Sequence, residues 1–351
     1  MHPQVPPDPG SFLRTNRFGD HDELTALIRG ASTEFIQRAP GAFTGEFTSV
    51  FLETGAVQFA QVGLPYLCRG TSSGDRLMFI LHLKPQDEYV WKGQVLDRRA
   101  MMFLPPRTEH QSITPPDSYW ALLTFERAHV EEALASPDGA GSMLNSDTSR
   151  VLLPETESFE GLRRRLKAIH AAVRLDPSFL DVSQARRGVE ESILLALVQA
   201  LASASRVRPK DYSVATHARV ARQVEAYLST TLGEPLYLGD LCAVAGVGER
   251  TLRYVFQERF GMSPVRYLKL RRLHQARRAL RRADPDLNTV QSIANHCGIW
   301  HLGRFAQEYR TLFNEQPLET LRKTFLLERS ERSPAASPSP RRGASPVPGL
   351  D

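Results

Sequence analysis

Residues 241–264 read LCAVAGVGERTLRYVFQERFGMSP, and residues 293–317 repeat the same pattern as IANHCGIWHLGRFAQEYRTLFNEQP. Each copy begins with a short apolar segment, turns at Gly246 or Gly298, and continues as an amphipathic segment that closes at Gly261 or Asn314. A short helix, a tight turn and a second helix together form a helix-turn-helix. The duplication therefore predicts two such motifs in tandem, an arrangement suited to reading two neighbouring stretches of a DNA groove.

The second helix of the first motif is predicted to run from about Glu249 to Arg259. Its apolar residues fall on one side, where they anchor the helix, and its long polar residues fall on the other at positions i, i+3, i+4 and i+7. These outward residues are Arg250, Arg253, Tyr254 and Gln257. Arginine matches the O6 and N7 acceptors of guanine, while Gln and Tyr can meet other base edges or phosphate. The helix therefore has the two sides that a recognition helix needs.

The second motif has the same two-sided pattern but fewer long polar side chains. Its inward residues are Phe305, Tyr309 and Leu312. Its outward residues are Gly303, Arg304, Gln307 and Thr311, with Arg310 as a further candidate contact. The first turn, which enters the groove when such a motif docks, holds Trp300, His301 and Leu302, and Leu302 is either a core residue or a contact to a thymine methyl group. Because one Arg and one Gln are the only strong base readers, we expect the first motif to discriminate more.

A basic segment, Ser263–Arg282, joins the two motifs and is predicted to be one helix. Ser263 is suited to cap it, and Pro264 is suited to its first position. About eighteen helical residues span near 27 Å, which would place the two motifs in successive major grooves on one side of the duplex. Its arginines are candidate phosphate contacts, and we expect two or three of them to touch DNA: Arg271, Arg272, Arg277, Arg278, Arg281 and Arg282.

The charge of the chain is concentrated around the repeated motif. Residues 216–325 hold 17 Lys or Arg and 10 Asp or Glu, a net charge of +7. Residues 1–215 hold 23 Lys or Arg and 26 Asp or Glu, a net charge of −3. A basic excess confined to one segment is typical of a nucleic-acid-binding surface, although a solvated basic surface would show it as well.

Residues 216–325 resemble the DNA-binding domain of AraC/XylS-family transcription regulators. The resemblance rests on the segments Leu241–Ala243 with Gly246, Thr251–Arg253 with Phe256, Gly261–Pro264, Tyr267–Leu268, Arg272–Leu273 with Ala276, and Ile293–Ala294 with Cys297–Gly298. It implies base contacts from Arg250, Arg253 and Tyr254 of the first motif and from Leu302, Gly303, Arg304 and Gln307 of the second. It also implies an activator that works as a homodimer with RNA polymerase and responds to a small-molecule effector, which the sequence does not identify.

The sequence departs from the family pattern in the second motif. Ile299 stands where the family usually has an aromatic residue, and Gln307 stands where it usually has arginine. Asn314 replaces the glycine that usually closes the second recognition helix, although Asn also adopts the left-handed conformation needed there. These departures bear on the specificity of the second motif and leave the expected fold unchanged.

The N-terminal half is predicted to be a small β-sandwich or barrel followed by helices. Short apolar runs separated by Gly, Pro and Asp turns predict strands over Thr48–Leu52, Val57–Val62, Leu77–Leu83, Ala100–Leu104 and Ala121–Phe125. The nearly continuous apolar run at Leu77–Leu81 is expected to be buried on both faces. Helices are predicted over residues 128–135, 162–173 and 189–201. The apolar stripes of the last two pack either onto the β-domain or against a second subunit.

The expected fold class is α+β, with an N-terminal domain that the resemblance makes a cupin-like β-barrel and a C-terminal all-α domain with two helix-turn-helix motifs. The predicted divisions are a disordered N-terminus (1–15), the cupin-like sensor domain (16–150), a helical segment that could dimerise (151–205), a linker (206–215), the AraC-type domain (216–325) and a disordered tail (326–351). The proline-rich start and the Pro/Ser/Arg-rich end have little apolar surface to bury.

Composition favours a cytoplasmic protein. No apolar run is long enough to span a membrane, and the N-terminus lacks the features of a secretion signal. Three widely spaced cysteines, Cys68, Cys242 and Cys297, fit a reducing compartment. We expect double-stranded promoter DNA as the partner, no membrane association, and no cofactor.

Two other functions fit parts of the sequence. In a cupin-type metalloenzyme fused to a helical domain, a barrel would hold a metal, yet His82, Glu88 and the distant His110 are fewer ligands than the usual set. Because no nucleotide-binding or nucleophile motif occurs in a supporting context, we expect no enzyme activity. A nonspecific architectural DNA-binding protein would bind with steep salt dependence and little discrimination between sites.

Overall fold

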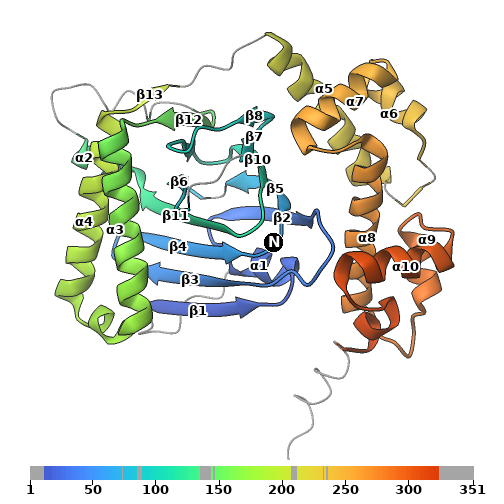
Figure 1. Ribbon diagram of the computed structural model, residues 1–351, viewed down its shortest axis with the longest axis horizontal. Coiled ribbons are helices and arrows are strands. Elements are labelled where there is room, and N and C mark those ends of the chain that lie inside the picture. The colour runs from blue at the N-terminus through green and yellow to red at the C-terminus, as the bar shows by residue number, and fades with distance from the viewer. Residues whose placement is uncertain are drawn as a thin grey trace, which may run out of the picture.

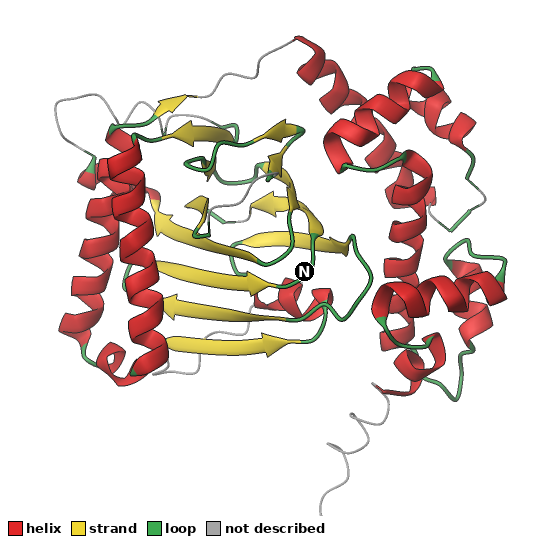
Figure 2. Cartoon of the chain, viewed as in Figure 1, coloured by secondary structure: helices red, strands yellow, loops and turns green. Residues whose placement is uncertain are grey.

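The computed structural model describes residues 12–72, 74–84, 89–134, 144, 147–206, 212–231, 233–234 and 236–323. Figure 1 shows a β-rich part with two long helices on its outer side and a second part that is entirely helical, and Figure 2 shows that the strands are confined to the first part. None of the helices in the described ranges is long and apolar enough to cross a membrane. The expected tail, 326–351, lies outside the described residues, as do residues 207–211 of the expected linker. The rest of that linker belongs instead to β13 (Ser205–Arg206) and α5 (Tyr212–Thr231).

Two antiparallel sheets form the β-domain. The first has the strand order β1 (Leu13–Phe18), β3 (Gly45–Phe51), β4 (Gly55–Val62), β11 (Ser118–Glu126), β6 (Arg76–His82), β9 (Met101–Leu104), β12 (Arg150–Leu153) and β13 (Ser205–Arg206). The second has the order β2 (Ala31–Gln37), β5 (Tyr66–Ser72), β10 (Glu109–Thr114), β7 (Val90–Trp91) and β8 (Gln94–Val95), and α1 (His21–Leu27) precedes β2. Neither order returns to its first strand, so the fold is mixed α and β as expected, but a closed cupin-like barrel is not confirmed.

The central strand β6 is buried on both faces, as its continuous apolar run predicts. Leu77, Phe79 and Leu81 point to the side covered by helices, whereas Met78 points into the core between the two sheets. The helices on the first side are α2 (Arg127–Ala133), α3 (Thr156–Leu175) and α4 (Ser183–Ala202), with a 3₁₀ helix, η2 (Pro177–Asp181), between the last two.

The apolar stripes of α3 and α4 pack within the chain. Leu162 and Leu166 of α3, and Ile193 and Leu197 of α4, are fully buried in the same core as the outer face of the first sheet. Figure 1 shows the two helices side by side across that sheet. The stripes therefore pack on the β-domain, which was one of the two interpretations of their sequence. A dimer formed through the same stripes would first have to expose them.

Several strands were not predicted from the sequence, because some of their outward residues are polar. Glu34, Arg69 and Gln111 lie side by side on β2, β5 and β10, so those strands lack the apolar runs by which β3, β4 and β6 are recognised. The expected disorder of residues 1–15 also extends too far. Leu13 begins β1, which pairs with β3 along its whole length, whereas residues 1–11 lie outside the described part.

The helical domain consists of α5 (Tyr212–Thr231), α6 (Leu238–Ala245), α7 (Glu249–Phe260), α8 (Pro264–Arg282), α9 (Val290–His296) and α10 (Leu302–Phe313). The four predicted turn residues all have left-handed backbone angles: φ is 63° at Gly246, 63° at Gly261, 72° at Gly298 and 57° at Asn314. Glycine, and to a lesser degree asparagine, adopts this region with little strain. Ser263 caps α8 and Pro264 is its first residue, as predicted.

The outer face of the second sheet packs directly against the helical domain. Ile36, Leu67 and Ile113 are cross-strand neighbours on β2, β5 and β10, and all three are buried in the same apolar core as α7, α8 and α10. We call these three residues, together with Glu34, Arg69 and Gln111 beside them, the docking face. The two helix-turn-helix motifs thus pack, through the helical domain, on the β-domain.

Candidate nucleic-acid interface

The first reading helix, α7, is fixed by its inner side and free on its outer side. Leu252, Val255, Phe256 and Phe260 are buried in the domain core. Arg250, Arg253, Tyr254 and Gln257, the predicted outward residues, are all exposed. The ring of Tyr254 lies edge-on to His217 of α5, with centroids 5.3 Å apart, so it is oriented although it faces solvent.

The second reading helix, α10, has the same division. Phe305, Tyr309, Leu312 and Phe313 are buried, whereas Gly303, Arg304, Gln307, Arg310 and Thr311 are exposed. Leu302 is half-buried and packs against the core, which favours its core role. Trp300, just before the helix, is 57% exposed, an unusual position for a large aromatic side chain. A Cβ on Gly303 would meet nothing within 4 Å, so packing does not require glycine there.

Helix α8 connects the two motifs, with α6 and α7 near one end and α9 and α10 near the other (Figure 1). Its 19 residues correspond to a length of about 28 Å at 1.5 Å per residue. The prediction of one helix of this length between the two motifs is therefore confirmed.

Most of the α8 arginines, the candidate phosphate contacts, are engaged in contacts inside the protein. Arg271 pairs with Glu225 of α5 at 3.2 Å, and Arg278 pairs with Glu34 of β2 at 2.7 Å. Arg277 pairs with Glu315 at 2.8 Å, and Arg281 pairs with Asp20. Arg272 donates to the carbonyl oxygen of Glu234, and Arg282 is exposed. The sequence could not reveal this, because Asp20 and Glu34 lie more than two hundred residues away along the chain.

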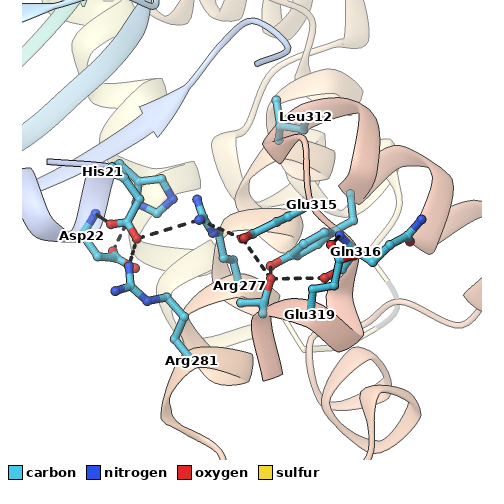
Figure 3. A network of polar contacts seen from close by, with 12 residues as sticks. His21, Asp22, Arg277, Arg281, Leu312, Glu315, Gln316 and Glu319 are labelled. Carbon is cyan, nitrogen blue, oxygen red and sulfur yellow. Dashed lines mark hydrogen bonds and ion pairs between the residues drawn. The ribbon is translucent and has the colours of Figure 1, made fainter. Parts of the chain in front are cut away.

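One aspartate caps α1 and also pairs with α8, whose Arg277 and Arg281 appear in Figure 3 near His21 and Asp22 of α1. Asp20 caps α1 by accepting hydrogen bonds from the backbone N–H groups of Asp22 (2.8 Å) and Glu23 (2.9 Å). The same carboxylate meets Arg281, and its other neighbour Arg277 lies 3.8 Å away. Because this aspartate is 4% exposed, its charge is poorly screened by solvent. The start of the β-domain is therefore tied to the C-terminal half of α8.

A pair of buried histidines crosses the same boundary. Nδ1 of His274 on α8 lies 2.8 Å from Nε2 of His21 on α1, and both residues are completely buried. Burial lowers the pKa of His274 well below its ordinary value, and the nearby His21 adds to the effect. Burial likewise lowers the pKa of His21, although its hydrogen bond with Asp22 opposes the shift. Both imidazoles are therefore neutral at neutral pH, one donating a hydrogen bond and the other accepting it.

A second charged cluster lies on the docking face. Glu34 accepts hydrogen bonds from Arg69 (2.6 Å) and from Arg278 (2.7 Å), and Arg69 also pairs with Glu225. Burial would raise the pKa of Glu34, but the guanidinium groups of Arg69, Arg271 and Arg278 outweigh it and lower the value to about 2. The cluster thus connects β2 and β5 of the β-domain with α5 and α8 of the helical domain.

The β-domain also binds the C-terminal ends of both reading helices. The Leu312 carbonyl of α10 accepts hydrogen bonds from the Gln37 side chain (2.7 Å) and from the Gly41 backbone (3.1 Å). The side chains of Gln111 and Arg38 donate to the carbonyls of Arg259 (2.7 Å) and Gly261 (3.0 Å) at the end of α7. These bonds satisfy helix-end carbonyls that would otherwise lack partners. Sequence reasoning missed Gln37, Arg38 and Gln111, because isolated polar residues in a strand region carry no distinguishing pattern.

The histidines considered as metal ligands lie in different sheets. His82 ends β6 of the first sheet, with its ring centroid 3.9 Å from that of Tyr89. His110 is on β10 of the second sheet, where its Nε2 lies 3.5 Å from Cys68 Sγ. Glu88 lies outside the described residues. Across the part of the chain that the structure covers, no group of three or more His, Cys, Asp or Glu residues is arranged to hold a metal.

Two reading helices with exposed polar faces, joined by one long helix on a shared core, define a tandem helix-turn-helix domain. Comparison with known proteins agrees. A family model described as "Helix-turn-helix domain" matches residues 241–323. The C-terminal domain of this chain is a DNA-binding domain of the AraC/XylS family.

The similar proteins match this domain only. The "Probable thc operon regulatory protein" of Rhodococcus erythropolis is 39% identical over 103 residues, covering 29% of this chain and 31% of that protein. The "XylDLEGF operon transcriptional activator" of Pseudomonas putida is 32% identical over 101 residues, covering 29% of this chain and 32% of that protein. The chain thus spans about a third of the length of these curated relatives.

Among solved structures, a probable AraC family transcriptional regulator from Rhodopseudomonas palustris is 37% identical to this chain. The match covers 30% of this chain and 96% of that one, with a TM-score of 0.28.

Proposed function

We propose that this protein is a sequence-specific DNA-binding regulator of transcription whose helices α7 and α10 enter successive major grooves. The observation that carries the proposal is the division of both helices into a buried apolar side and an exposed polar side. Arg250, Arg253 and Arg304 supply the side chains best suited to guanine. The net charge of +7 over residues 216–325 supplies the attraction to phosphate.

Further parts of the proposal rest on the family resemblance. The protein would act in the cytoplasm as a homodimer, activate transcription through contact with RNA polymerase, and respond to a small-molecule effector. The two-sheet domain, which we relate to the cupin-like sensor domains of the family, would receive that effector. Because the β-domain holds both reading helices at their C-terminal ends, a change in the β-domain has a direct route to the DNA-reading surface.

Arg253→Ala is expected to weaken binding at one base position. If Arg253 reads a guanine, its loss costs about 1–3 kcal/mol at that position and relaxes the preference there. The measurement is a set of dissociation constants for the preferred duplex and for duplexes with single base-pair replacements. Arg164→Ala is the matched control, because Arg164 is an exposed arginine of α3 in the β-domain and should leave every constant unchanged.

The pattern of losses separates base contacts from phosphate contacts. A loss confined to one base pair supports the assigned role of Arg253. A uniform loss over all duplexes, together with a weaker salt dependence, would instead make Arg253 a phosphate contact. If the wild-type protein bound all duplexes equally, the proposed function itself would be wrong.

A further inference from the structure

Arg304 of α10 is held by a carboxylate that is itself held by another helix. Nε of Arg304 donates to Oε1 of Glu308 at 2.8 Å, and Nζ of Lys269 on α8 lies 2.7 Å from the same oxygen. The Arg304 side chain is 76% exposed, whereas that of Glu308 is only 22% exposed. Burial would raise the pKa of Glu308, but its hydrogen bonds with Lys269 and Arg304 lower it, so the carboxylate is charged at neutral pH. Glu308 is therefore an anion held in place beneath the long, exposed side chain of Arg304.

The contact leaves the base-reading edge of Arg304 available. Only Nε is bound to Glu308, and within the described residues the two terminal nitrogens have no hydrogen-bond partner. Arginine chelates O6 and N7 of guanine through two parallel N–H donors. A long flexible side chain ordinarily loses rotamer freedom when it makes such a contact. An arginine already held at Nε loses less.

The first reading helix provides an instructive comparison. Arg253 also has a glutamate four residues away, but there the terminal Nη2 of the arginine bonds to Glu249 at 3.3 Å. Both side chains of that pair are more than half exposed, at 56% and 60%, and within the described part of the chain Glu249 has no other ion-pair partner. Arg253 must break this contact before both terminal nitrogens can reach a base, whereas Arg304 does not.

Helix stabilisation explains the pair on α7 better than the pair on α10. A glutamate placed N-terminal to its basic partner at i, i+4, as Glu249 is to Arg253, is the favourable order in a helix. Arg304 and Glu308 have the reverse order, and Arg304 lies in the first turn of α10, where the helix dipole disfavours a cation. A carboxylate on a surface that approaches phosphate is also electrostatically unfavourable. Neither helix stability nor attraction to DNA therefore explains why Glu308 is present.

We propose that Glu308 is a positioning residue that, anchored by Lys269, holds Arg304 for bidentate contact with a guanine. This inference rests on the proposed DNA-binding function and deepens it. It assigns to α10 a stronger preference for one G·C base pair than the composition of its outward face indicates. The two reading helices are then more nearly equal than the count of their arginines suggests.

The test is a double-mutant cycle read out as base discrimination. Glu308→Gln keeps the size and the acceptor oxygen but removes the charge. It is expected to reduce discrimination about two- to fivefold, the range of an exposed ion pair, at the one base pair that Arg304→Ala also affects. Affinity for an unrelated duplex should stay the same or rise, because a negative charge near phosphate is removed. In the Arg304→Ala background, Glu308→Gln should no longer change discrimination at that base pair.

Two further variants complete the experiment. Lys269→Met removes the anchor without altering either partner on α10, and it should reproduce the direction of the Glu308→Gln effect even if that variant folds poorly. Glu249→Gln on α7 is the matched control, and it should not reduce discrimination at the base read by Arg253. Equal weakening on all duplexes, no change in discrimination, or a change in discrimination that persists in the Arg304→Ala background would each overturn the proposal. A wild-type protein without sequence preference would instead reject the proposed function on which it rests.

Discussion

Leu67→Asp is expected to separate the helical domain from the β-domain while each remains folded. Leu67 lies at the centre of the docking face, directly opposite Ile36 and Ile113 on the neighbouring strands, and it is fully buried. An unpaired carboxylate in that apolar environment costs several kcal/mol, on the order of 3 or more. In the separated form the same carboxylate would face water. The substitution therefore penalises docking and spares the core between the two sheets, toward which Leu67 does not point.

Scanning calorimetry and small-angle X-ray scattering measure this separation. The wild-type protein should show a single unfolding transition and a compact radius of gyration, and Leu67→Asp should show two transitions and a larger radius. Leu67→Met keeps an apolar side chain of similar volume and should behave like the wild type. A Leu67→Asp protein with an unchanged radius and a single transition at the wild-type temperature would show that the docking face does not hold the domains together.

Acidification from about pH 7.5 to about pH 5.5 is expected to weaken the same docking. Burial lowers the pKa values of His274 and His21 in the docked protein, and separation into water restores them to about 6.5. The separated form therefore binds protons more readily. Docking is at full strength above about pH 6.5 and weakens below it, by up to about 1.4 kcal/mol per pH unit for each histidine that titrates.

The surroundings of the histidine pair intensify this effect. Arg277 and Arg278 disfavour an additional positive charge. Asp22 favours it at His21 through their hydrogen bond, and the Gln37 carbonyl favours it at His274. The carboxylate of Glu34 titrates in a separate range, because its pKa is lowered to about 2 and its contribution is lost only below about pH 4.5. The histidine effect can therefore be measured without interference from that cluster.

The radius of gyration of wild type and variants as a function of pH tests this assignment. His274→Gln can still form hydrogen bonds but cannot bind a proton at that position, so docking should depend less steeply on pH below 6.5 than in the wild type. His129→Gln alters a half-buried histidine of α2, which packs on the first sheet, and should keep the wild-type pH dependence. Identical pH curves for His274→Gln and the wild type would show that another group controls the acid response.

Short-range features of the fold were accessible from the sequence. The reading helix expected at Glu249–Arg259 is α7, Glu249–Phe260, and the turn glycines and Asn314 have the left-handed angles that their positions require. Helical periodicity and turn chemistry depend on residues a few positions apart, so the outward faces of α7 and α10 could be assigned correctly. The same locality explains why β3, β4 and β6 were found.

Features that depend on distant partners were not accessible. The sequence of α8 indicates a row of candidate phosphate contacts, but in the structure Asp20 and Glu34 pair with two of these arginines. The strands of the docking face carry polar residues because their partners belong to another domain, so they lack the apolar alternation of ordinary strands. The sequence also left open whether the apolar stripes of α3 and α4 pack on a sheet or on a second subunit. An apolar stripe predicts that its residues are buried, but it does not identify the surface that buries them.

Selection from a pool of randomised DNA duplexes tests the central claim most directly. The purified protein is mixed with the pool at about 0.15 M salt, where surface charges are screened beyond about 8 Å, and the bound duplexes are recovered and sequenced. The account predicts enrichment of one motif with two preferred blocks about one helical turn apart, roughly 10 base pairs. Recovery of the pool without enrichment, with binding that falls steeply as salt is added, would contradict it and identify a nonspecific DNA-binding protein.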